Sequence, residues 1–284
     1  MARPLRLCKN IGWLALIAGP LCAGSANADE LVHFESAAVQ PTPFQQRNAQ
    51  QSGQVLKTVP STLLNGYLTR PPGDGKFPAV VLLHGCAGVL QNDKVAWPQR
   101  LSSWGYVVLV VDSFSPRGIQ DTCKGLLVDR VYDAYGALEF VSKYSFVDSS
   151  RIALMGFSAG GIATFEAVQL GGVEGLMERK FKAAIAYYPN CSTTNGDMAV
   201  PTLILEGELD DFSPLKKCQQ MMAQRSGKGS SVQLDVYKGA HHAFDAAEFK
   251  TGIEAYGHWV QYNEAAADQS ISDVRDFLQK TLGN

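Results

Sequence analysis

The stretch Ile152-Ala153-Leu154-Met155-Gly156-Phe157-Ser158-Ala159-Gly160-Gly161 decides the fold of this chain. Its first four residues form an unbroken apolar run, typical of a strand buried on both faces of a parallel sheet. The Gly-x-Ser-x-Gly sequence that follows stands where a strand gives way to a helix, a context typical of a strained turn that exposes the Ser158 hydroxyl above the sheet. A glycine-rich helix start that merely packs tightly on the sheet is the structural alternative. The segments around this stretch decide between the two.

Apolar runs and helical patterns alternate along the chain on both sides of this stretch. Strands are predicted at 79–83, 107–111, 152–155, 183–187, 202–205 and 232–237, with an antiparallel edge from 55–59 and 63–69. Helices are predicted at 97–104, 128–141, 162–170, 214–224 and 271–282. This order predicts an α/β fold, in which helices cover both faces of a mostly parallel sheet. No internal repeat or flexible linker divides the pattern, so one domain is expected over residues 54–284.

Composition supports a globular protein that does not bind nucleic acid. The chain has 284 residues, of which 46% are hydrophobic and 18% are charged, so it can bury a sizeable core. Lys and Arg total 25 against 27 for Asp and Glu, which leaves a formal charge of −2. No basic block is present that could neutralise a run of phosphates.

Residues 1–28 have the features of a secretory signal peptide rather than of the folded domain. Basic residues precede an apolar run at 11–21, and Ser25-Ala26-Asn27-Ala28 supplies small residues for a cleavage after Ala28. A retained membrane anchor is the alternative, but the run is short for a bilayer span and contains Pro20. The protein is therefore expected in the periplasm or outside the cell. Residues 29–53 are polar and glutamine-rich, which predicts an extended arm over the surface.

Export changes the interpretation of the cysteines. Loss of the signal peptide leaves Cys86, Cys123, Cys191 and Cys218, and thiols in an oxidising compartment form disulfides. Three full pairings are possible, and we favour Cys86–Cys123 with Cys191–Cys218 because each pair joins neighbouring segments of the expected fold. A zinc site is the alternative, but no Cys-x-x-Cys spacing is present.

Two further segments that contain potential catalytic residues follow at the ends of later predicted strands. The strand 202–205 runs into Glu206-Gly207-Glu208-Leu209-Asp210-Asp211, and the strand 232–237 runs into Gly239-Ala240-His241-His242. The carboxyl ends of parallel strands meet at one edge of the sheet, where ligands bind. A serine hydroxyl needs an imidazole to take its proton, and the imidazole needs a carboxylate to orient it. Ser158, an aspartate near 210 and a histidine near 242 therefore form a candidate catalytic triad in the chain order of a hydrolase.

The motifs together resemble those of the dienelactone hydrolase family within the α/β-hydrolase fold, from about residue 62 to 282. The matching segments are His84-Gly85-Cys86-Ala87-Gly88, Gly156-Phe157-Ser158-Ala159-Gly160-Gly161, Gly207-Glu208-Leu209-Asp210-Asp211-Phe212-Ser213-Pro214 and Tyr237-Lys238-Gly239-Ala240-His241-His242-Ala243-Phe244. In the family's pattern the acid falls on Asp210 rather than Asp211, and the base on His242 rather than His241. The resemblance implies a hydrolase of carboxylic esters, with lactones as a further candidate class, that works through an acyl-enzyme on Ser158. No large lid domain is expected.

The chain departs from the family's founding members at two positions. Where they have a cysteine nucleophile and a nearby glutamate, this chain has Ser158 and Gly85. The thiol activation that depends on that glutamate is therefore absent, which makes dienelactone itself a doubtful substrate.

Further residues are expected around the triad. The backbone N–H groups of Ala159 and Cys86 are candidates for the oxyanion hole. Arg117 is a candidate for holding a substrate carboxylate, as an arginine after this strand does in the dienelactone enzymes, with a salt bridge to Asp112 or Asp121 as the alternative. Aromatic residues at strand ends, Tyr188 and Phe244, are candidates for the pocket wall.

Two other functional classes stay open on the sequence. A serine peptidase of the prolyl oligopeptidase type shares the fold and triad order but carries a gating domain for which this chain has no room. A non-catalytic binding protein on the same fold would ordinarily have lost a member of the triad. No metal or nucleotide motif is present, so no cofactor is expected, and the expected partner is a small-molecule ester. The sequence does not define an oligomeric state.

Overall fold

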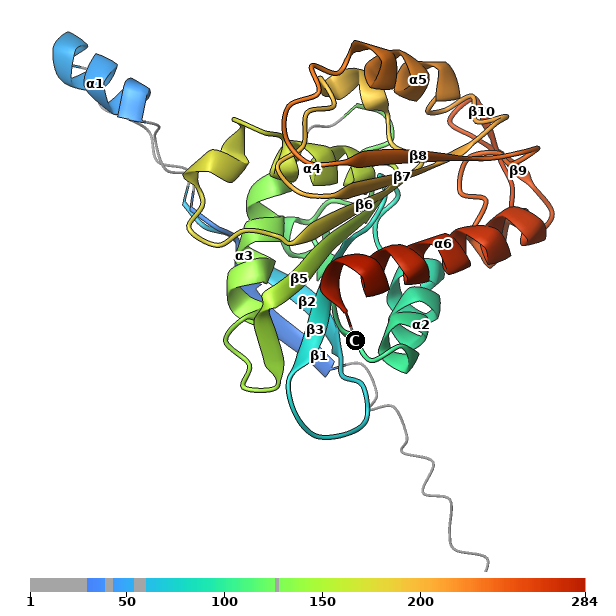
Figure 1. Cartoon of the computed structure of the whole chain (residues 1–284), viewed down its shortest axis with the longest axis horizontal. Coiled ribbons are helices and arrows are strands. Elements are labelled where there is room, and N and C mark those ends of the chain that lie inside the picture. Colours follow the sequence, from blue (N-terminus) through green and yellow to red (C-terminus); the bar gives the residue numbers. More distant parts are fainter. Residues whose placement is uncertain (1–29, 39–42, 54–59, 126–127, 284) are drawn as a thin grey trace, which may run out of the picture.

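The computed structural model describes residues 30–38, 43–53, 60–125 and 128–283. An eight-stranded sheet runs through the centre in the order β1-β2-β4-β3-β5-β6-β7-β8 (Figure 1). β1 and β2 are antiparallel to their neighbours, and the strands from β4 to β8 pair in parallel. The strands are β1 (Glu30–Glu35), β2 (Leu63–Thr69), β3 (Phe77–Leu83), β4 (Val107–Asp112), β5 (Val147–Phe157), β6 (Ala183–Tyr187), β7 (Thr202–Gly207) and β8 (Val232–Tyr237).

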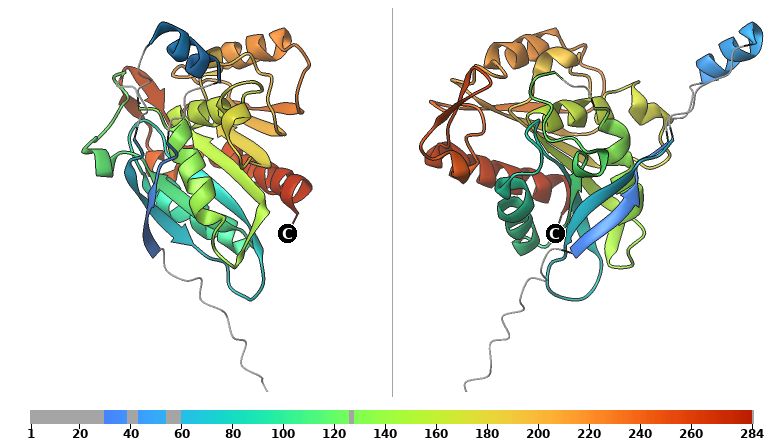
Figure 2. Two further views of the ribbon diagram at one scale, coloured as in Figure 1. Left: turned by 90° about the vertical axis from the view of Figure 1, so that its left-hand side faces the viewer. Right: turned by 180° about the vertical axis from the view of Figure 1, so that it is seen from behind.

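Helices cover both faces of this sheet, as Figures 1 and 2 show. On one face lie α3 (Val131–Val141), α4 (Ala159–Val168) and α5 (Leu215–Gln224), and on the other lie α2 (Trp97–Ser103) and α6 (Glu264–Leu282). Alternate side chains of each central strand enter the two apolar cores. Val81 and Leu154 pack toward α3 and α4, whereas Val80 and Met155 pack toward α2 and α6. The continuous apolar runs in β3 to β7 thus correspond to strands buried on both faces, whereas β8 at the sheet edge is only partly buried. The predicted fold class is confirmed.

The N-terminal region differs from the expected extended arm. Glu30–Glu35 is the edge strand β1, which pairs antiparallel with β2, and Pro43–Ser52 is the helix α1. Val32 and Phe34 are buried while their neighbours along β1 are exposed. This alternation is the period-two pattern of a half-buried strand. β1 therefore forms one edge of the sheet, and the prediction of an extended surface arm for 29–53 was wrong over the described residues.

Other expectations differ in their bounds or lie outside the described residues. The signal peptide at 1–28 and the strand at 55–59 belong to the part of the chain that the structure does not describe. The last helix begins at Glu264 rather than at residue 271, because the Asn263 side chain caps it by accepting a hydrogen bond from Ala266 N at 3.1 Å. Among the described residues, no helix combines the length and apolar character needed to cross a membrane.

A small hairpin that the sequence analysis missed precedes α6. It consists of β9 (Ile253–Ala255) and β10 (His258–Val260), joined by Tyr256 and Gly257. Both loop residues have positive φ, at 56° and 84°, as a two-residue hairpin turn requires. We call residues 245–262, which include this hairpin, the cap segment.

Candidate active site

Ser158 lies in a strained turn between β5 and α4. Its backbone has φ 51° and ψ −116°, a conformation that non-glycine residues rarely adopt. Close packing of the two elements maintains the turn. A Cβ atom on Gly156 would lie 2.2 Å from Gly160 O, and one on Gly160 would lie 2.4 Å from Leu83 O. The two glycines are therefore required by packing, and they hold the Ser158 side chain at the N-terminus of α4.

The structure brings Ser158, His242 and Asp210 into one hydrogen-bonded chain. His242 Nε2 lies 3.0 Å from Ser158 Oγ, and His242 Nδ1 lies 2.7 Å from Asp210 Oδ2. Because a carboxylate only accepts hydrogen bonds, Nδ1 carries the proton in the neutral ring and Nε2 accepts from the serine hydroxyl. This is the arrangement needed for Nε2 to remove the Ser158 proton.

Backbone donors fix the carboxylate of Asp210, and aromatic rings flank the imidazole of His242. Asp210 Oδ1 accepts hydrogen bonds from Phe212 N at 2.8 Å and Ser213 N at 2.7 Å, in the turn after β7. The imidazole of His242 lies between the rings of Tyr188 and Phe212, with centroid distances of 4.6 and 4.8 Å. The neighbouring Asp211 instead lies 3.6 Å from His258 Nδ1, and His241 Nδ1 is buried without a hydrogen-bond partner among the described residues. The geometry thus selects Asp210 and His242 rather than Asp211 and His241.

A cavity of about 380 Å³ opens beside Ser158 and His242. One side is formed by the loop after β3, and the other side is formed by the cap segment. The cap segment is held to the histidine loop, because Gln261 N donates to His242 O at 3.3 Å and Asn263 N, directly after the segment, donates to Phe244 O at 2.9 Å. Its contributions to the lining are mostly apolar: Ala246, Phe249, Ile253, Ala255, Tyr256 and Val260. Sequence reasoning missed this wall, for which the Tyr256-Gly257 turn between β-forming residues was the available signal.

The loop after β3 carries Cys86, which lines the cavity and is bonded to Cys123. Cys123 lines the cavity as well, and Thr122 N donates to Cys86 O at 2.8 Å. This disulfide therefore fixes the loop against the segment 120–125. The other expected oxyanion residue, Ala159, is the first residue of α4 and directly follows Ser158.

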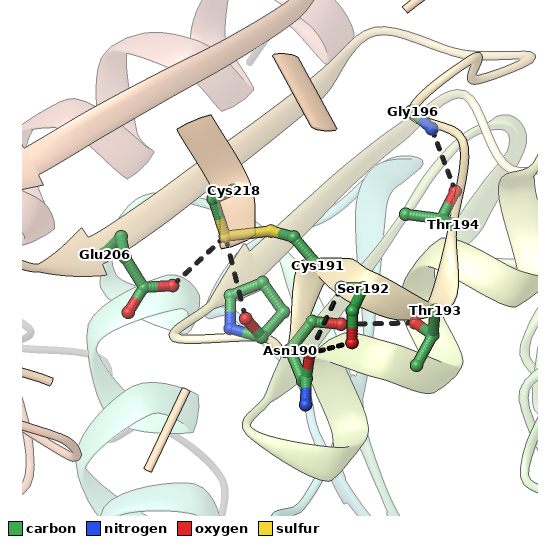
Figure 3. Close-up of a disulfide and its surroundings, with 9 residues drawn as sticks. Asn190, Cys191, Ser192, Thr193, Thr194, Gly196, Glu206 and Cys218 are labelled. Carbon is green, nitrogen blue, oxygen red and sulfur yellow. Dashed lines mark hydrogen bonds between the residues drawn. A yellow bond between two sulfur atoms is a disulfide. The ribbon is translucent and has the colours of Figure 1, made fainter. Parts of the chain in front are cut away.

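The second disulfide, Cys191–Cys218, connects the segment after β6 with α5 (Figure 3). Both favoured cysteine pairings are therefore present. Cys218 Sγ lies 3.5 Å from a carboxyl oxygen of Glu206, a fully buried residue at the end of β7 (Figure 3). Burial, followed by the nearby charge of Asp210, raises the pKa of Glu206 well above its usual range. This second acid beside the triad was not identified from the sequence.

Arg117 does not occupy the position expected of a substrate-binding residue. Its guanidinium donates two hydrogen bonds of 2.8 Å to Asp133 and one of 2.6 Å to Ser113 O. The Asp133 side chain is fully buried in α3, and Arg117 is not among the residues that line the cavity beside Ser158. The expected carboxylate contact is therefore corrected to a structural ion pair. The partner is Asp133 rather than Asp112 or Asp121, because α3 passes beneath the turn that carries the arginine.

The two expected aromatic residues have different positions. Tyr188 lines the cavity, and its hydroxyl donates to Asp245 Oδ1 at 2.8 Å. Phe244 is fully buried in the core against Tyr187, Tyr188 and Tyr237, and it is not among the lining residues. The expectation that Phe244 contacts substrate is therefore corrected, because its ring fills the space beneath the histidine loop.

His84 is a structural residue below the site. Its ring nitrogens contact Gly85 O at 2.7 Å and Ser113 N at 3.3 Å, and burial, helped by the charge of Arg130, lowers its pKa to about 4. Nε2 therefore accepts from Ser113 N in the neutral ring. Within the described parts of the chain, no group of three or more His, Cys, Asp or Glu side chains could hold a metal ion.

A serine at a strained strand-to-helix turn, bonded to a histidine and an aspartate at the carboxyl edge of a mostly parallel sheet, defines the class of α/β-hydrolases. Within that class the chain belongs to the dienelactone hydrolase family, whose sequence profile matches residues 64–282. The family expected from the motifs is therefore confirmed.

Individual relatives agree with this assignment. A Methylorubrum extorquens protein, provisionally named a carboxymethylenebutenolidase, is 24% identical over 255 residues, which cover 81% of this chain and 83% of that protein. Cutinase 2 of Thermobifida cellulosilytica is 30% identical over 158 residues, or 53% of this chain and 54% of the cutinase. The crystal structure of P91, a dienelactone hydrolase-like promiscuous phosphotriesterase from metagenomic libraries, is similar over 90% of this chain and 100% of P91, with a TM-score of 0.65 at 16% sequence identity. The last similarity concerns the fold.

Proposed function

We propose that this protein hydrolyses carboxylic esters through an acyl-enzyme on Ser158, with His242 as general base and acid and Asp210 as the group that orients the imidazole. The observation that carries the proposal is the chain of hydrogen bonds from Ser158 Oγ through His242 to Asp210, beside an accessible cavity. Membership of the dienelactone hydrolase family and the similarity to a cutinase support an ester hydrolase.

In the first half of the reaction, His242 Nε2 takes the proton of Ser158 as Oγ attacks the carbonyl carbon of the ester. The negative charge that develops on the carbonyl oxygen is stabilised by backbone N–H groups, for which we propose Ala159 and Cys86. The N-terminus of α4 adds a positive dipole end near Ser158. His242 then gives its proton to the alkoxide that leaves, and Ser158 retains the acyl group.

In the second half, a water molecule gives a proton to His242 and attacks the acyl carbon. The bond to Ser158 Oγ then breaks, His242 returns the proton to Oγ, and the carboxylic acid is released. Asp210 stays ionised throughout and stabilises the imidazolium. Lactones are esters and can follow the same steps, with the alcohol and the acid released as one molecule.

Labelling with a fluorophosphonate probe tests this proposal together with ester turnover. We expect the protein to be labelled and to cleave 4-nitrophenyl esters, and we expect Ser158→Ala to lose both properties. A peptide anilide is the contrasting substrate, because a peptidase of the prolyl oligopeptidase type would cleave it. Unchanged ester turnover in Ser158→Ala would contradict the proposal.

We further propose that residues 1–28 are a cleaved signal peptide and that the protein acts in the periplasm or outside the cell. The two disulfides support this, because structural disulfides persist in oxidising compartments. Mass determination of the protein isolated from its host tests the cleavage, which is expected to leave Asp29 as the first residue.

A further inference from the structure

An acid outside the triad, Asp93, faces the cavity that contains Ser158 and His242. Asp93 belongs to the π-helical turn Asn92–Ala96, lines the cavity and is 3% exposed. Leu90 N donates to its Oδ2 at 3.1 Å. A π-helical turn is an irregularity that often accompanies functional sites. The catalytic steps proposed above do not use this carboxyl group.

Two further acids lie behind Asp93. The oxygens of Asp245 accept hydrogen bonds of 2.8 Å from Asn92 Nδ2, Trp97 Nε1 and Tyr188 Oη. A buried carboxylate requires such hydrogen-bond donors. Glu248 Oε1 accepts from Asn92 N at 3.5 Å. This side of the cavity therefore carries an excess of acidic groups.

No compensating cation is present in the cavity lining that the structure describes, which contains neither lysine nor arginine. Lys94, next to Asp93, places its Nζ 3.8 Å from the centre of the Tyr67 ring. Arg117, the expected anion-binding residue, is held by Asp133. The charged groups of Lys94 and Arg117 thus contact residues outside the cavity lining.

Burial is the main reason that the pKa of Asp93 lies well above its usual range, and the charges of Asp245 and Glu248 raise it further. The group therefore carries a proton under conditions where an exposed aspartate is ionised. In that form it offers an O–H donor to an uncharged oxygen of a ligand, and it does not repel the ligand. A carboxylate in the same cavity would lose its hydration and gain no cationic partner.

We propose that the cavity accepts uncharged esters with an apolar body and excludes esters that carry a carboxylate, and that Asp93 is a specificity-determining residue for this choice. The inference rests on the proposed ester hydrolysis and names its substrate class. The apolar lining, including Phe157, Phe249 and Ile253, fits the hydrocarbon part of such esters. The acidic side of the cavity accounts for the exclusion of anions.

A matched pair of substrates tests the proposal. Mono-4-nitrophenyl adipate ends in a carboxylate, and 4-nitrophenyl 5-carbamoylpentanoate has a carboxamide of nearly the same shape in its place. We expect kcat/KM for the carboxamide to exceed that for the carboxylate by at least about 100-fold at pH 8, because the carboxylate loses its hydration in the cavity and finds no cationic partner there. Comparable kcat/KM values for the two esters would overturn the proposal while leaving ester hydrolysis intact. Cleavage of neither ester would instead contradict the proposed function, on which the inference rests.

The role of Asp93 is tested by pH and by substitution. The preference for the carboxamide is measured in the wild-type protein from pH 6 to pH 8.5, and it is expected to increase with pH wherever Asp93 loses its proton, because ionisation adds a negative charge to the cavity. In Asp93→Asn the preference is expected to be smaller, by about tenfold at the higher pH, and independent of pH. Asp74→Asn is the control, since Asp74 is exposed in the turn between β2 and β3 and lies outside the cavity lining.

The pH series in wild-type protein needs no substitution, so the proposal stays testable if Asp93→Asn does not fold. A preference in wild-type protein that does not rise at any pH at which the protein stays folded, or that equals the preference of Asp93→Asn protein throughout the series, would overturn the role assigned to Asp93.

Discussion

Arg117 and Asp133 form a two-pronged ion pair in which both hydrogen bonds are 2.8 Å long. Asp133 is fully buried at the start of α3, whereas the arginine side chain is 20% exposed. Loss of one partner from such a pair leaves a buried charge without compensation. The pair therefore stabilises the contact between α3 and the turn after β4.

We predict that Arg117→Ala lowers the free energy of unfolding by about 3 kcal/mol, at the lower end of the range for buried pairs because the arginine is partly exposed. Urea unfolding measures this loss. The ratio of kcat/KM for neutral and anionic esters is expected to stay as in the wild-type protein. A selective loss of activity toward anionic esters would return Arg117 to the role of an anion-binding residue.

The hydrogen-bonded chain from Ser158 to Asp210 predicts unequal effects of substitution within the triad. Ser158→Ala and His242→Ala are each expected to lower kcat by about 10⁶-fold, and Asp210→Asn by about 10⁴-fold, because the amide favours the wrong imidazole tautomer. Far-UV circular dichroism is expected to be unchanged in all three. If Asp211→Asn, the neighbouring control, had the larger effect, the assignment of the acid would be wrong.

Close approach of α4 to the end of β3 makes Gly160 sensitive to a single added carbon. A Cβ atom there would lie 2.4 Å from Leu83 O and 2.6 Å from His84 O, both backbone atoms of the loop that leads to Cys86. We predict that Gly160→Ala lowers the free energy of unfolding by about 3 kcal/mol or more. Gly175→Ala is the control, since a Cβ atom on Gly175 has no atom within 4 Å, and it is expected to have little effect.

Much of this fold was predictable because burial leaves a direct trace in the sequence. The strands β3 to β7 are buried on both faces, so they appear as continuous apolar runs, and Gly156-Phe157-Ser158-Ala159-Gly160 marks the transition to α4. The triad followed from the same logic, because Asp210 and His242 come directly after strands whose carboxyl ends lie at one edge. The family pattern resolved the choice between adjacent residues.

The features that the sequence did not reveal depend on contacts between distant segments. Arg117 was expected to bind a ligand, but its partner Asp133 lies 16 residues away, and only the path of α3 brings them together. The cap segment has two three-residue strands, too short for a clear hydrophobic period. Asp93 and Asp245 are 152 positions apart in number and meet only when the cap segment folds against the π-helical turn, so no local pattern identifies the acidic side of the cavity.

The two disulfides are expected to differ in their effect on activity. Cys86 and Cys123 both line the cavity, and Cys86 N–H is a proposed oxyanion donor. Their bridge joins residues 37 positions apart and the Cys191–Cys218 bridge joins residues 27 apart, so each is expected to contribute about 3–4 kcal/mol to stability. We predict that Cys86→Ser with Cys123→Ser lowers kcat/KM by about 10- to 100-fold, since a displaced donor weakens transition-state binding.

Cys191→Ser with Cys218→Ser is the matched control for that double variant, because it removes a bridge of similar span that does not line the cavity. Kinetics at a temperature where both variants are folded separate activity from stability. Equal losses of kcat/KM in the two double variants would mean that the Cys86–Cys123 bridge has no special effect on the site.

The raised pKa of Glu206 predicts that the free energy of unfolding decreases as the pH rises. Its pKa in the folded protein is raised well above the ordinary value, mainly by burial and then by the charge of Asp210. Between the ordinary glutamate pKa and the raised value, the folded state binds a proton that the unfolded state has lost, so the free energy of unfolding falls with increasing pH. Each pH unit within this interval costs about 1.4 kcal/mol.

We predict that Glu206→Gln, which keeps the shape of the protonated side chain and cannot ionise, loses less stability than the wild-type protein between pH 5 and pH 8. The pKa of Asp93 is raised too, so Asp93 also makes the free energy of unfolding fall with increasing pH. Glu206→Gln is therefore expected to reduce this pH dependence without abolishing it. Urea unfolding at the two pH values measures the difference. Glu208→Gln provides the comparison, because Glu208 is an exposed carboxyl two positions along the chain that accepts a hydrogen bond from Gly239 N. If both variants shared the wild-type pH dependence, Glu206 would not be the protonated acid beside Asp210; a reduced dependence in Glu206→Gln alone would identify it as that acid.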